Sequence, residues 1–260
     1  MNVEKTLIEQ KVLNAAKPYL KDKVVKDLVI GLSMVGCQLN DGHVGLSYVL
    51  RYDLPQGCSA FDYTQNIIGM PAWQVANWVL SGKDILQKSI GAAVLTAASR
   101  SFPIGDDNED SLFGLDIKAG DIVGMIGYIK PVARMLSKKV KELIIFDEGV
   151  EESEDNNFVC KMEMQPSLLP RCNKVIITGS STINGTIDNL LCMCENAEQI
   201  ALVGSSTPMF KEAFEGTNVV SLAGSWWQEK DKDKIFKIIS LAGGIAQLKP
   251  YMIKKIDFVK

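Results

Sequence analysis

KVIITGSSTINGTIDNLL, residues 174 to 191, is the stretch that decides the fold predicted for this chain. Val175–Ile177 is a short β-branched run, which is typical of a strand buried on both faces. The polar segment 178–182 ends that strand. Residues 184–186 then lead into Ile187, Leu190 and Leu191, whose spacing gives a helix one apolar face. A strand, a glycine-containing polar loop and a helix start together predict the edge of a binding site with free backbone N–H groups.

The rest of the second half repeats this alternation of short apolar strands and helices. We predict helices at 131–140, from 186, from 208 and at 232–242, and strands at 122–126, 143–146, 175–177, 200–203 and 219–222. Parallel neighbouring strands need crossover connections, so the alternation predicts a parallel sheet with helices on its faces. The second half therefore reads as a Rossmann-like domain, and the fold class is α/β.

The first half has a different pattern. A helical period covers residues 3–19, and two predicted strands, 29–35 and 44–50, flank the tight-turn signal Asn40-Asp41-Gly42. Two helical patterns follow, at 71–80 and 84–98. This is an α+β unit. The acidic stretch 101–119, with its Pro and Gly, interrupts all periodicity, so we place a domain boundary there, between residues 1–105 and 106–260.

Composition excludes several classes of function. A net charge of −3 and a pI near 5.4 argue against a nucleic-acid-binding protein, which would show a basic domain or stripe. Apolar runs never approach the ~20 residues that span a bilayer, and the amphipathic start of the chain lacks a signal sequence. Six cysteines without framework spacing fit a reducing compartment, so we expect a cytoplasmic protein. Its oligomeric state stays open.

Loops at the ends of the predicted parallel strands are the candidate ligand-binding site, because ligands bind beyond the carboxyl ends of such strands. Gly-Ser-Ser-Thr occurs twice, at 179–182 and 204–207, and small hydroxyl residues at two equivalent strand ends suit an anionic or highly polar ligand. Alternatively, Gly, Ser and Thr are simply good turn and cap residues. The candidate ligand-binding residues here are Thr178, Gly179, Ser180, Ser181, Thr182, Asn184, Gly185, Thr186, Gly204, Ser205, Ser206 and Thr207.

Four further candidates follow earlier strands. Gly127 belongs to a G-x-x-G pair that falls short of the dinucleotide fingerprint, and no P-loop motif occurs. Asp147 lies 20 residues after Gly127, where Rossmann-like domains place the acid that holds a ribose hydroxyl, and Glu148 is its neighbour. The alternative is that both acids simply open the acidic loop 151–155. Lys130 would begin a helix, where a lysine is unfavourable unless an anion is nearby.

A metal site has weaker support in the residue pattern. One histidine and the absence of a C-x-x-C pair exclude a zinc site of the usual spacing. Cys192 and Cys194 would point to different faces of a regular helix, which favours a structural role for both. A Cys37/His43 pair could serve a soft metal only if both side chains faced the interdomain cleft; otherwise His43 is a surface residue beside a turn.

Several phrases resemble a known family. TGSSTINGTIDNLL (178–191), with GMIGYIKPV (124–132), FDEG (146–149) and LVGSSTPMF (202–210), resembles the heavy-metal chelation family of prokaryotic proteins. In the first half, DGHVGLSYVL (41–50) and SIGAAVLTAASR (89–100) look like the domain associated with it. The resemblance implies an N-terminal part similar to the enolase N-terminal domain, a Rossmann-like part reminiscent of methyltransferases, and a cleft between them. Glu148, 178–186 and 204–207 match these phrases, whereas Cys37 and His43 do not.

Together these observations predict a protein that binds a metal ion, or a metal-bearing small molecule, in the interdomain cleft. Glu148 would supply charge, the hydroxyl loops would hold the organic or anionic part, and the metal would be a transition or heavy metal. The second hypothesis is an enzyme that uses a nucleotide-like cofactor such as S-adenosylmethionine, with Asp147 or Glu148 on the ribose. The third is a scaffold with a packed domain interface. No reaction follows from the residues alone, so catalytic activity stays open.

Overall fold

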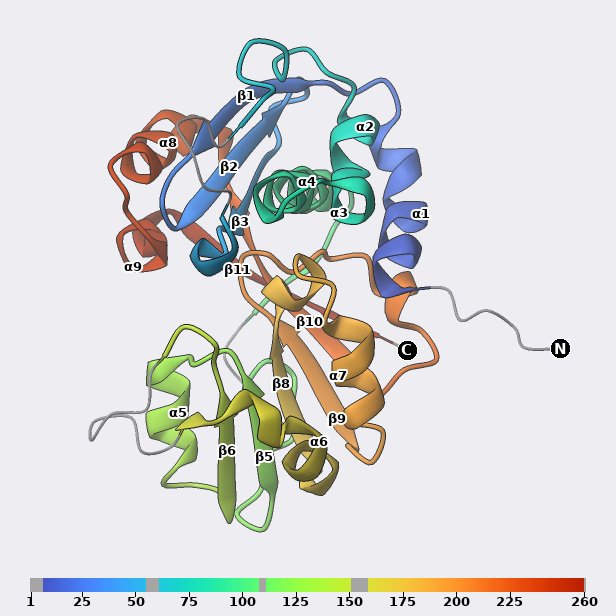
Figure 1. Cartoon of the computed structure of the whole chain (residues 1–260), viewed down its shortest axis with the longest axis vertical. Helices are drawn as coiled ribbons and strands as arrows, with labels where there is room; N and C mark the ends of the chain where they lie inside the picture. Colours follow the sequence, from blue (N-terminus) through green and yellow to red (C-terminus); the bar gives the residue numbers. More distant parts are fainter. Residues whose placement is uncertain (1–6, 55–60, 108–110, 151–158, 260) are drawn as a thin grey trace, which may run out of the picture.

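The computed structural model describes residues 7–54, 61–107, 111–150 and 159–259. Within them, the strands form one 11-stranded sheet whose main path runs β1-β2-β3-β10-β9-β8-β5-β6-β7. Figure 1 shows the parallel strands pointing toward the helices of the first half. The predicted α/β class is confirmed.

The second half supplies the parallel part of the sheet. Each neighbouring pair from β7 to β10 is parallel, in the order β7-β6-β5-β8-β9-β10. This is the 3-2-1-4-5-6 order of doubly wound folds, whose crevice lies between the first and fourth strands, here β5 and β8. The strands are β5 (Ile122–Ile126), β6 (Glu142–Phe146), β7 (Val159–Cys160), β8 (Lys174–Thr178), β9 (Gln199–Val203) and β10 (Val219–Trp227).

Alternation along β8 explains why both faces of this sheet are covered. Val175 and Ile177 join the core cluster that contains Leu190 of α7 (Ile187–Met193), whereas Ile176 joins the cluster that contains Leu136 of α5 (Lys130–Leu136). Successive residues of a strand point to opposite faces, so a continuous apolar run buries both. The short helix α6 (Gln165–Leu168) precedes β8.

The first half has a three-stranded antiparallel sheet with helices α1 (Ile8–Leu20), α2 (Ala72–Ala76), α3 (Trp78–Ser81) and α4 (Ile85–Ala98). The Asn40-Asp41-Gly42 turn joins β2 (Met34–Leu39) to β3 (Val44–Tyr48) as predicted. The predicted strand 29–35 is wrong, since Gly31 to Ser33 separate β1 (Val25–Ile30) from β2. The turn has only three residues, Gly31, Leu32 and Ser33, and apolar residues lie on both sides of it.

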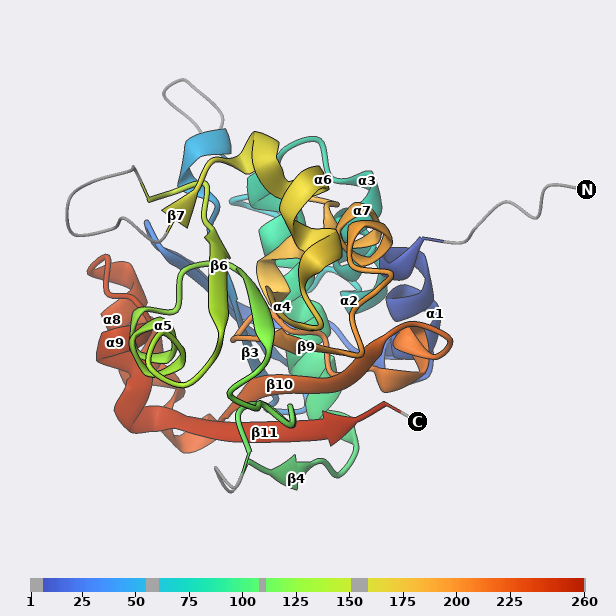
Figure 2. The same cartoon turned by 90° about the horizontal axis from the view of Figure 1, so that it is seen from below.

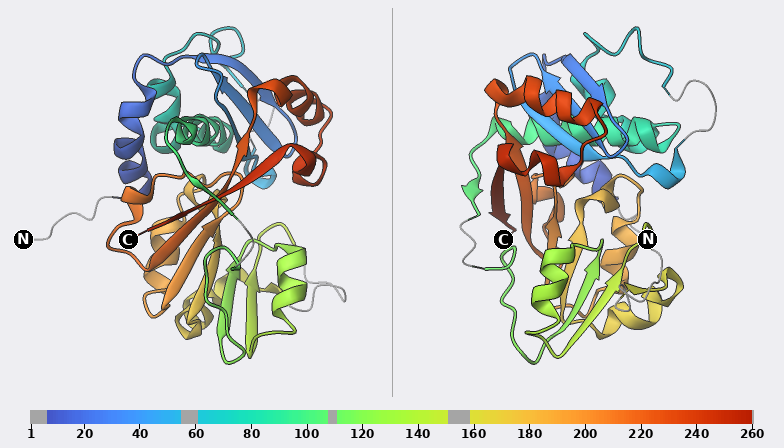
Figure 3. Two further views of the ribbon diagram at one scale, coloured as in Figure 1. Left: turned by 180° about the vertical axis from the view of Figure 1, so that it is seen from behind. Right: turned by 90° about the vertical axis from the view of Figure 1, so that its left-hand side faces the viewer.

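C-terminal elements complete the antiparallel sheet. α4 packs on one face of β2 and β3, while α8 (Lys232–Ser240) packs against β1 and β2 from the other, and α9 (Ile245–Leu248) lies beside α8 (Figure 3). Gly36 leaves room for the ring of Phe236, since a Cβ there would lie 2.8 Å from a ring carbon. The predicted helix at 232–242 is therefore present, and it covers strands some 200 residues earlier in the chain.

β10 joins the two halves of the sheet. Its end pairs with β3 through Trp227 and Val44, and β11 (Met252–Phe258) runs antiparallel along it with β4 (Gly105–Asp106) outside (Figure 2). One core cluster reaches from Leu13 and Ile90 in the first half to Ile177 in the second. The helix predicted from Pro208 is a 3-10 turn, Lys211–Phe214. The division at residues 105 and 106 stays a prediction, and this boundary falls within β4.

Candidate functional site

Three of the predicted loops meet at the carboxyl edge of the parallel sheet. A Cβ on Gly179 would lie 2.5 Å from the backbone nitrogen of Thr207, so the two Gly-Ser-Ser-Thr loops touch. A Cβ on Gly127 would lie 2.9 Å from the Cβ of Thr178, which brings the loop after β5 against the end of β8. These contacts lie at the switch point of the strand order, where doubly wound proteins bind their ligands.

Hydroxyl groups of the first Gly-Ser-Ser-Thr loop mostly bond within the loop. Ser181 Oγ donates to the Thr178 carbonyl and Thr182 Oγ1 to the Gly179 carbonyl, both at 2.8 Å. The Thr178 hydroxyl accepts the Ser180 N–H at 3.3 Å. Ser180, Ser181 and Thr182 are buried. The hydroxyl groups of this loop therefore stabilise the turn itself, in agreement with the alternative that Gly, Ser and Thr serve here as turn and cap residues.

The second Gly-Ser-Ser-Thr loop is different, because within the described residues it leaves one buried hydroxyl and two backbone N–H groups without partners. Gly204 has φ +111°, which opens the turn after β9. Among the described residues, the N–H groups of Ser205 and Ser206 have no hydrogen-bond acceptor, and the buried Thr207 hydroxyl has no partner. Unpaired buried donors cost free energy, so an acceptor bound at this loop would be stabilised.

Ser206 also ties the loop to the first half of the chain. Its Oγ accepts the Tyr48 N–H at 2.9 Å, and Ser205 Oγ lies 3.5 Å from Ser225 Oγ in β10. The ligand-binding candidates taken from the sequence do not include Tyr48 of β3 or Ser225 of β10, the strand that runs parallel to β9. Only the three-dimensional strand order brings them here.

Asn184 and Gly185 shape the start of α7. Asn184 Oδ1 accepts the Thr186 hydroxyl at 2.7 Å and the Thr186 N–H at 3.3 Å, and Gly185 has φ +73°. An asparagine that bonds two residues ahead is an Asx turn. These three residues therefore fix the loop, and Thr186 is the residue preceding α7.

Asp147 and Glu148, at the end of β6, differ sharply in their surroundings. The two oxygens of Asp147 accept the N–H groups of Tyr128, at 2.6 Å, and Gly149, at 2.8 Å. Asp147 thus holds the loops after β5 and β6 together. Glu148 is exposed, and within the described part of the chain its carboxylate has neither a hydrogen bond nor an ion pair. Tyr52, another residue outside any motif, donates its hydroxyl to the Gly149 carbonyl at 3.2 Å.

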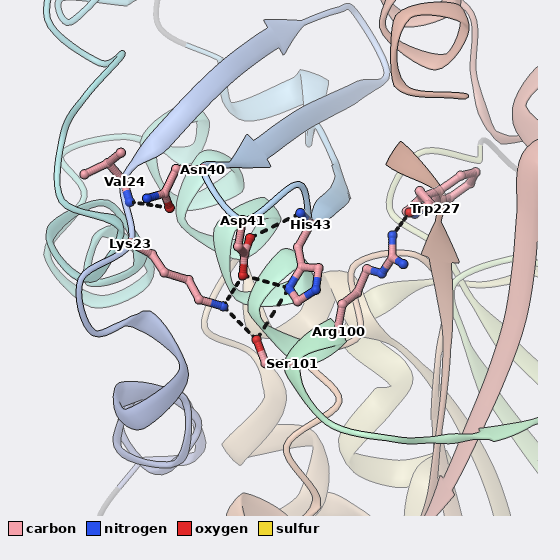
Figure 4. A network of polar contacts seen from close by, with 8 residues as sticks. All are labelled: Lys23, Val24, Asn40, Asp41, His43, Arg100, Ser101 and Trp227. Carbon is pink, nitrogen blue, oxygen red and sulfur yellow. Dashed lines mark hydrogen bonds and ion pairs between the residues drawn. The ribbon is translucent and has the colours of Figure 1, made fainter. Parts of the chain in front are cut away.

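His43 lies in a polar network at the turn between β2 and β3 (Figure 4). Its Nδ1 is 3.1 Å from Asp41 and 3.5 Å from Ser101 Oγ, while Lys23 pairs with Asp41 and donates to Ser101 at 2.8 Å. Burial lowers the pKa of His43; Asp41 opposes this, and the cations Lys23 and Arg100 lower it further. Glu229 acts in the same direction as Asp41, so the charges around this histidine are mixed.

Cys37 lies in different surroundings from His43. Its side chain is fully buried in the apolar cluster beneath α4, and burial raises the pKa of its thiol. Burial also raises the pKa of Cys172 to about 11 and of Cys194 to about 12, which opposes the thiolate form that metals bind. Cys192 is exposed. In the described ranges, no group of three or more His, Cys, Asp or Glu side chains is placed to hold a metal ion.

Gly179→Ala tests the contact between the two Gly-Ser-Ser-Thr loops. The added methyl group would press on the Thr207 nitrogen at 2.5 Å and its Oγ1 at 2.7 Å, so the loops must separate. We expect a loss of about 1–3 kcal/mol in the free energy of unfolding, measured in urea. Gly120→Ala is the control, since a Cβ there meets nothing within 4 Å. Equal stability of the two variants would contradict the contact.

The fold and this edge define a class: a doubly wound α/β protein with a polar loop cluster at its switch point. The model of a family described as "putative heavy-metal chelation" (DUF364) matches residues 111–258, and a second model of the same description (DUF4213) matches residues 13–99. The chain therefore belongs to the DUF364 family, which carries that description. None of the helices in the described ranges is long and apolar enough to cross a membrane.

Two solved structures share the fold across nearly the whole chain. A DUF364 protein of unknown function from Desulfitobacterium hafniense is 23% identical with a TM-score of 0.77, covering 96% of this chain and 98% of its own. Another, from Pyrococcus horikoshii, is 19% identical with a TM-score of 0.78, covering 97% and 100%. An uncharacterised protein of Methanocaldococcus jannaschii is 26% identical over 156 residues, 59% of this chain and 60% of that protein.

Proposed function

We propose that the chain binds a metal-bearing small molecule at the carboxyl edge of β5, β6, β8 and β9. The observation that carries the proposal is a set of donors without partners among the described residues: the N–H groups of Ser205 and Ser206 and the buried Thr207 hydroxyl. Donors of this kind suit the carboxylate, carbonyl or other oxygen acceptors of a ligand. Glu148, exposed and unpaired, supplies the negative charge that a metal centre attracts.

The strand order supports a molecule over a bare ion. Glu148 follows β6 and Ser205 follows β9, and β5 and β8 lie between these strands. Three strand spacings of about 4.8 Å separate the two ends by roughly 14 Å, more than one coordination sphere can span. The described residues also lack a cluster of three ligating side chains, so the molecule itself would supply most donors to its metal.

Thermal unfolding of the full chain tests this proposal. The probes are nickel and cobalt chlorides, a cobalt porphyrin with carboxylate side chains, molybdate and S-adenosylmethionine. A ligand at 100 times its dissociation constant adds about 2.7 kcal/mol to stability when it binds only the native state. We expect the metal-bearing molecule to raise the midpoint most. A rise with S-adenosylmethionine alone would contradict the proposal and favour a cofactor-dependent enzyme.

Glu148→Gln is the residue-level test. Losing this carboxylate should weaken binding of the metal-bearing probe by about tenfold or more, because the site loses a negative charge that has no partner among the described residues, while the fold stays intact. Titration calorimetry measures the change. Glu215→Gln is the matched control, since Glu215 is also exposed but follows the 3-10 turn Lys211–Phe214. Unchanged affinity in Glu148→Gln would remove Glu148 from the site.

A further inference from the structure

A second, separate pocket lies between α5 and the neighbouring strand β6. It has a volume of about 190 Å³. Leu143 and Ile145 of β6 contribute apolar lining, and the polar lining consists of Tyr128, Lys130, Arg134 and Ser137. A pocket of this size holds a group of a few atoms, well short of the 300–1,000 Å³ common for larger ligands.

The two cations of this pocket have no counter-charge among the residues that the structure describes. Within the described ranges, neither Lys130 nor Arg134 forms an ion pair or a side-chain hydrogen bond, and both are exposed. They lie one turn apart on α5, so their side chains share a face. Like charges at this spacing repel one another, and an anion between them would relieve the repulsion.

Tyr128 gives the pocket a third polar group. Asp147 accepts the Tyr128 N–H at 2.6 Å, which fixes the backbone that carries the phenol. Among the described residues the phenol hydroxyl has no hydrogen-bond partner, so it is free to donate. Ser137 already donates its hydroxyl to the Arg134 carbonyl at 3.2 Å.

We propose that this pocket binds a small oxyanion carried on a short carbon chain, such as a phosphomonoester or a short carboxylate. Arg134 offers a planar pair of donors and Lys130 a point charge, which together match phosphate or carboxylate oxygens. Tyr128 donates a further bond, and the carbon chain lies against Leu143 and Ile145. This site does not depend on Glu148 or on the Gly-Ser-Ser-Thr loops.

The test uses the full chain with three probes: inorganic phosphate, glycerol 3-phosphate and succinate. Titration calorimetry measures affinity, and backbone amide shifts locate binding. We expect at least one probe to bind, to shift the amides of Tyr128 and Ser137, and to bind about tenfold or more weakly to Lys130→Gln/Arg134→Gln. The preferred probe distinguishes phosphate from carboxylate ligands.

The matched control is Lys138→Gln/Lys139→Gln, which removes the same charge from exposed residues just beyond α5 that do not line the pocket. An equal loss of affinity in the control variant would mean that the effect comes from the net charge of the protein, and it would overturn the proposal. Absence of binding by all three probes, or shifts elsewhere, would also overturn it. Arg134→Lys keeps the charge but loses the planar donors, so weaker binding by this variant supports the site even if the double variant folds poorly.

Discussion

Gly45→Ala is expected to lower the free energy of unfolding by about 3 kcal/mol or more. Gly45 of β3 lies directly against the backbone of α4. A Cβ at this position would sit 2.6 Å from Thr96 Oγ1 and would press still closer on the Ala97 nitrogen and the Ala93 carbonyl oxygen. Those last two atoms are four residues apart in the helix, so the methyl group would enter the helix's own hydrogen-bond ladder.

Relief of this contact would require α4 to move away from β3. Ser47 Oγ donates to the Ser89 carbonyl at 2.6 Å and Thr96 Oγ1 to the Leu46 carbonyl at 3.1 Å, and both bonds would lengthen. Urea denaturation followed by circular dichroism measures the loss. Gly120→Ala should be nearly neutral, because a Cβ there meets nothing. A Gly45→Ala variant as stable as this control would mean that α4 does not pack so closely.

Local patterns predicted the parallel half well because its strands are buried on both faces. The predicted strand 122–126 has the same bounds as β5, and the predicted strand 200–203 is one residue shorter than β9. β11 was missed, since MIKKIDF mixes lysines with apolar residues and only Ile256 of its seven residues is buried. No local sequence pattern predicts the packing of α8 against β1 and β2, because these elements lie far apart in the sequence.

Part of the candidate site could likewise be predicted from the sequence, and part could not. The rule that ligand loops gather at the carboxyl ends of parallel strands correctly brought 127, 178–182 and 204–207 together. Sequence could not distinguish the two Gly-Ser-Ser-Thr loops, although one bonds internally and the other leaves donors unpaired. The sequence also could not predict that Asp147 and Glu148 have different roles. Only the structure shows that backbone N–H groups surround Asp147.

Glu9 is expected to make the stability of the protein fall as pH rises. The residue is only 5% exposed, and its Oε1 is buried without a hydrogen-bond partner in the described part of the chain. Burial raises the pKa of this carboxyl from 4.5 to about 7; the Glu9 N–H and Lys88 lower it, whereas Asp188 raises it further. Asp188 is in α7, where it accepts the Ile8 N–H at 3.0 Å, so the pair lies where α1 meets the second half.

The raised pKa determines the direction in which stability changes with pH. The native state holds this proton more tightly than the unfolded chain, so the stabilisation is complete below about pH 4.5 and is lost as pH rises through about 7. The difference between 4.5 and about 7 is roughly 2.5 pKa units, which corresponds to about 3 kcal/mol. Glu9→Gln cannot ionise, so at pH 8 it should be more stable than the parent chain by up to that amount, and nearly equal to it at pH 5.

Urea unfolding at several values between pH 5 and pH 8 measures this difference. Glu212→Gln, an exposed carboxylate replaced in the same way, should leave the pH dependence unchanged. Asp188→Asn keeps an oxygen for the Ile8 N–H while removing the charge, so it should lower the pKa of Glu9 and move the stability loss to lower pH. A parent chain and a Glu9→Gln variant with parallel pH profiles would show that Glu9 is solvated in the folded protein, and that α1 does not seal this junction.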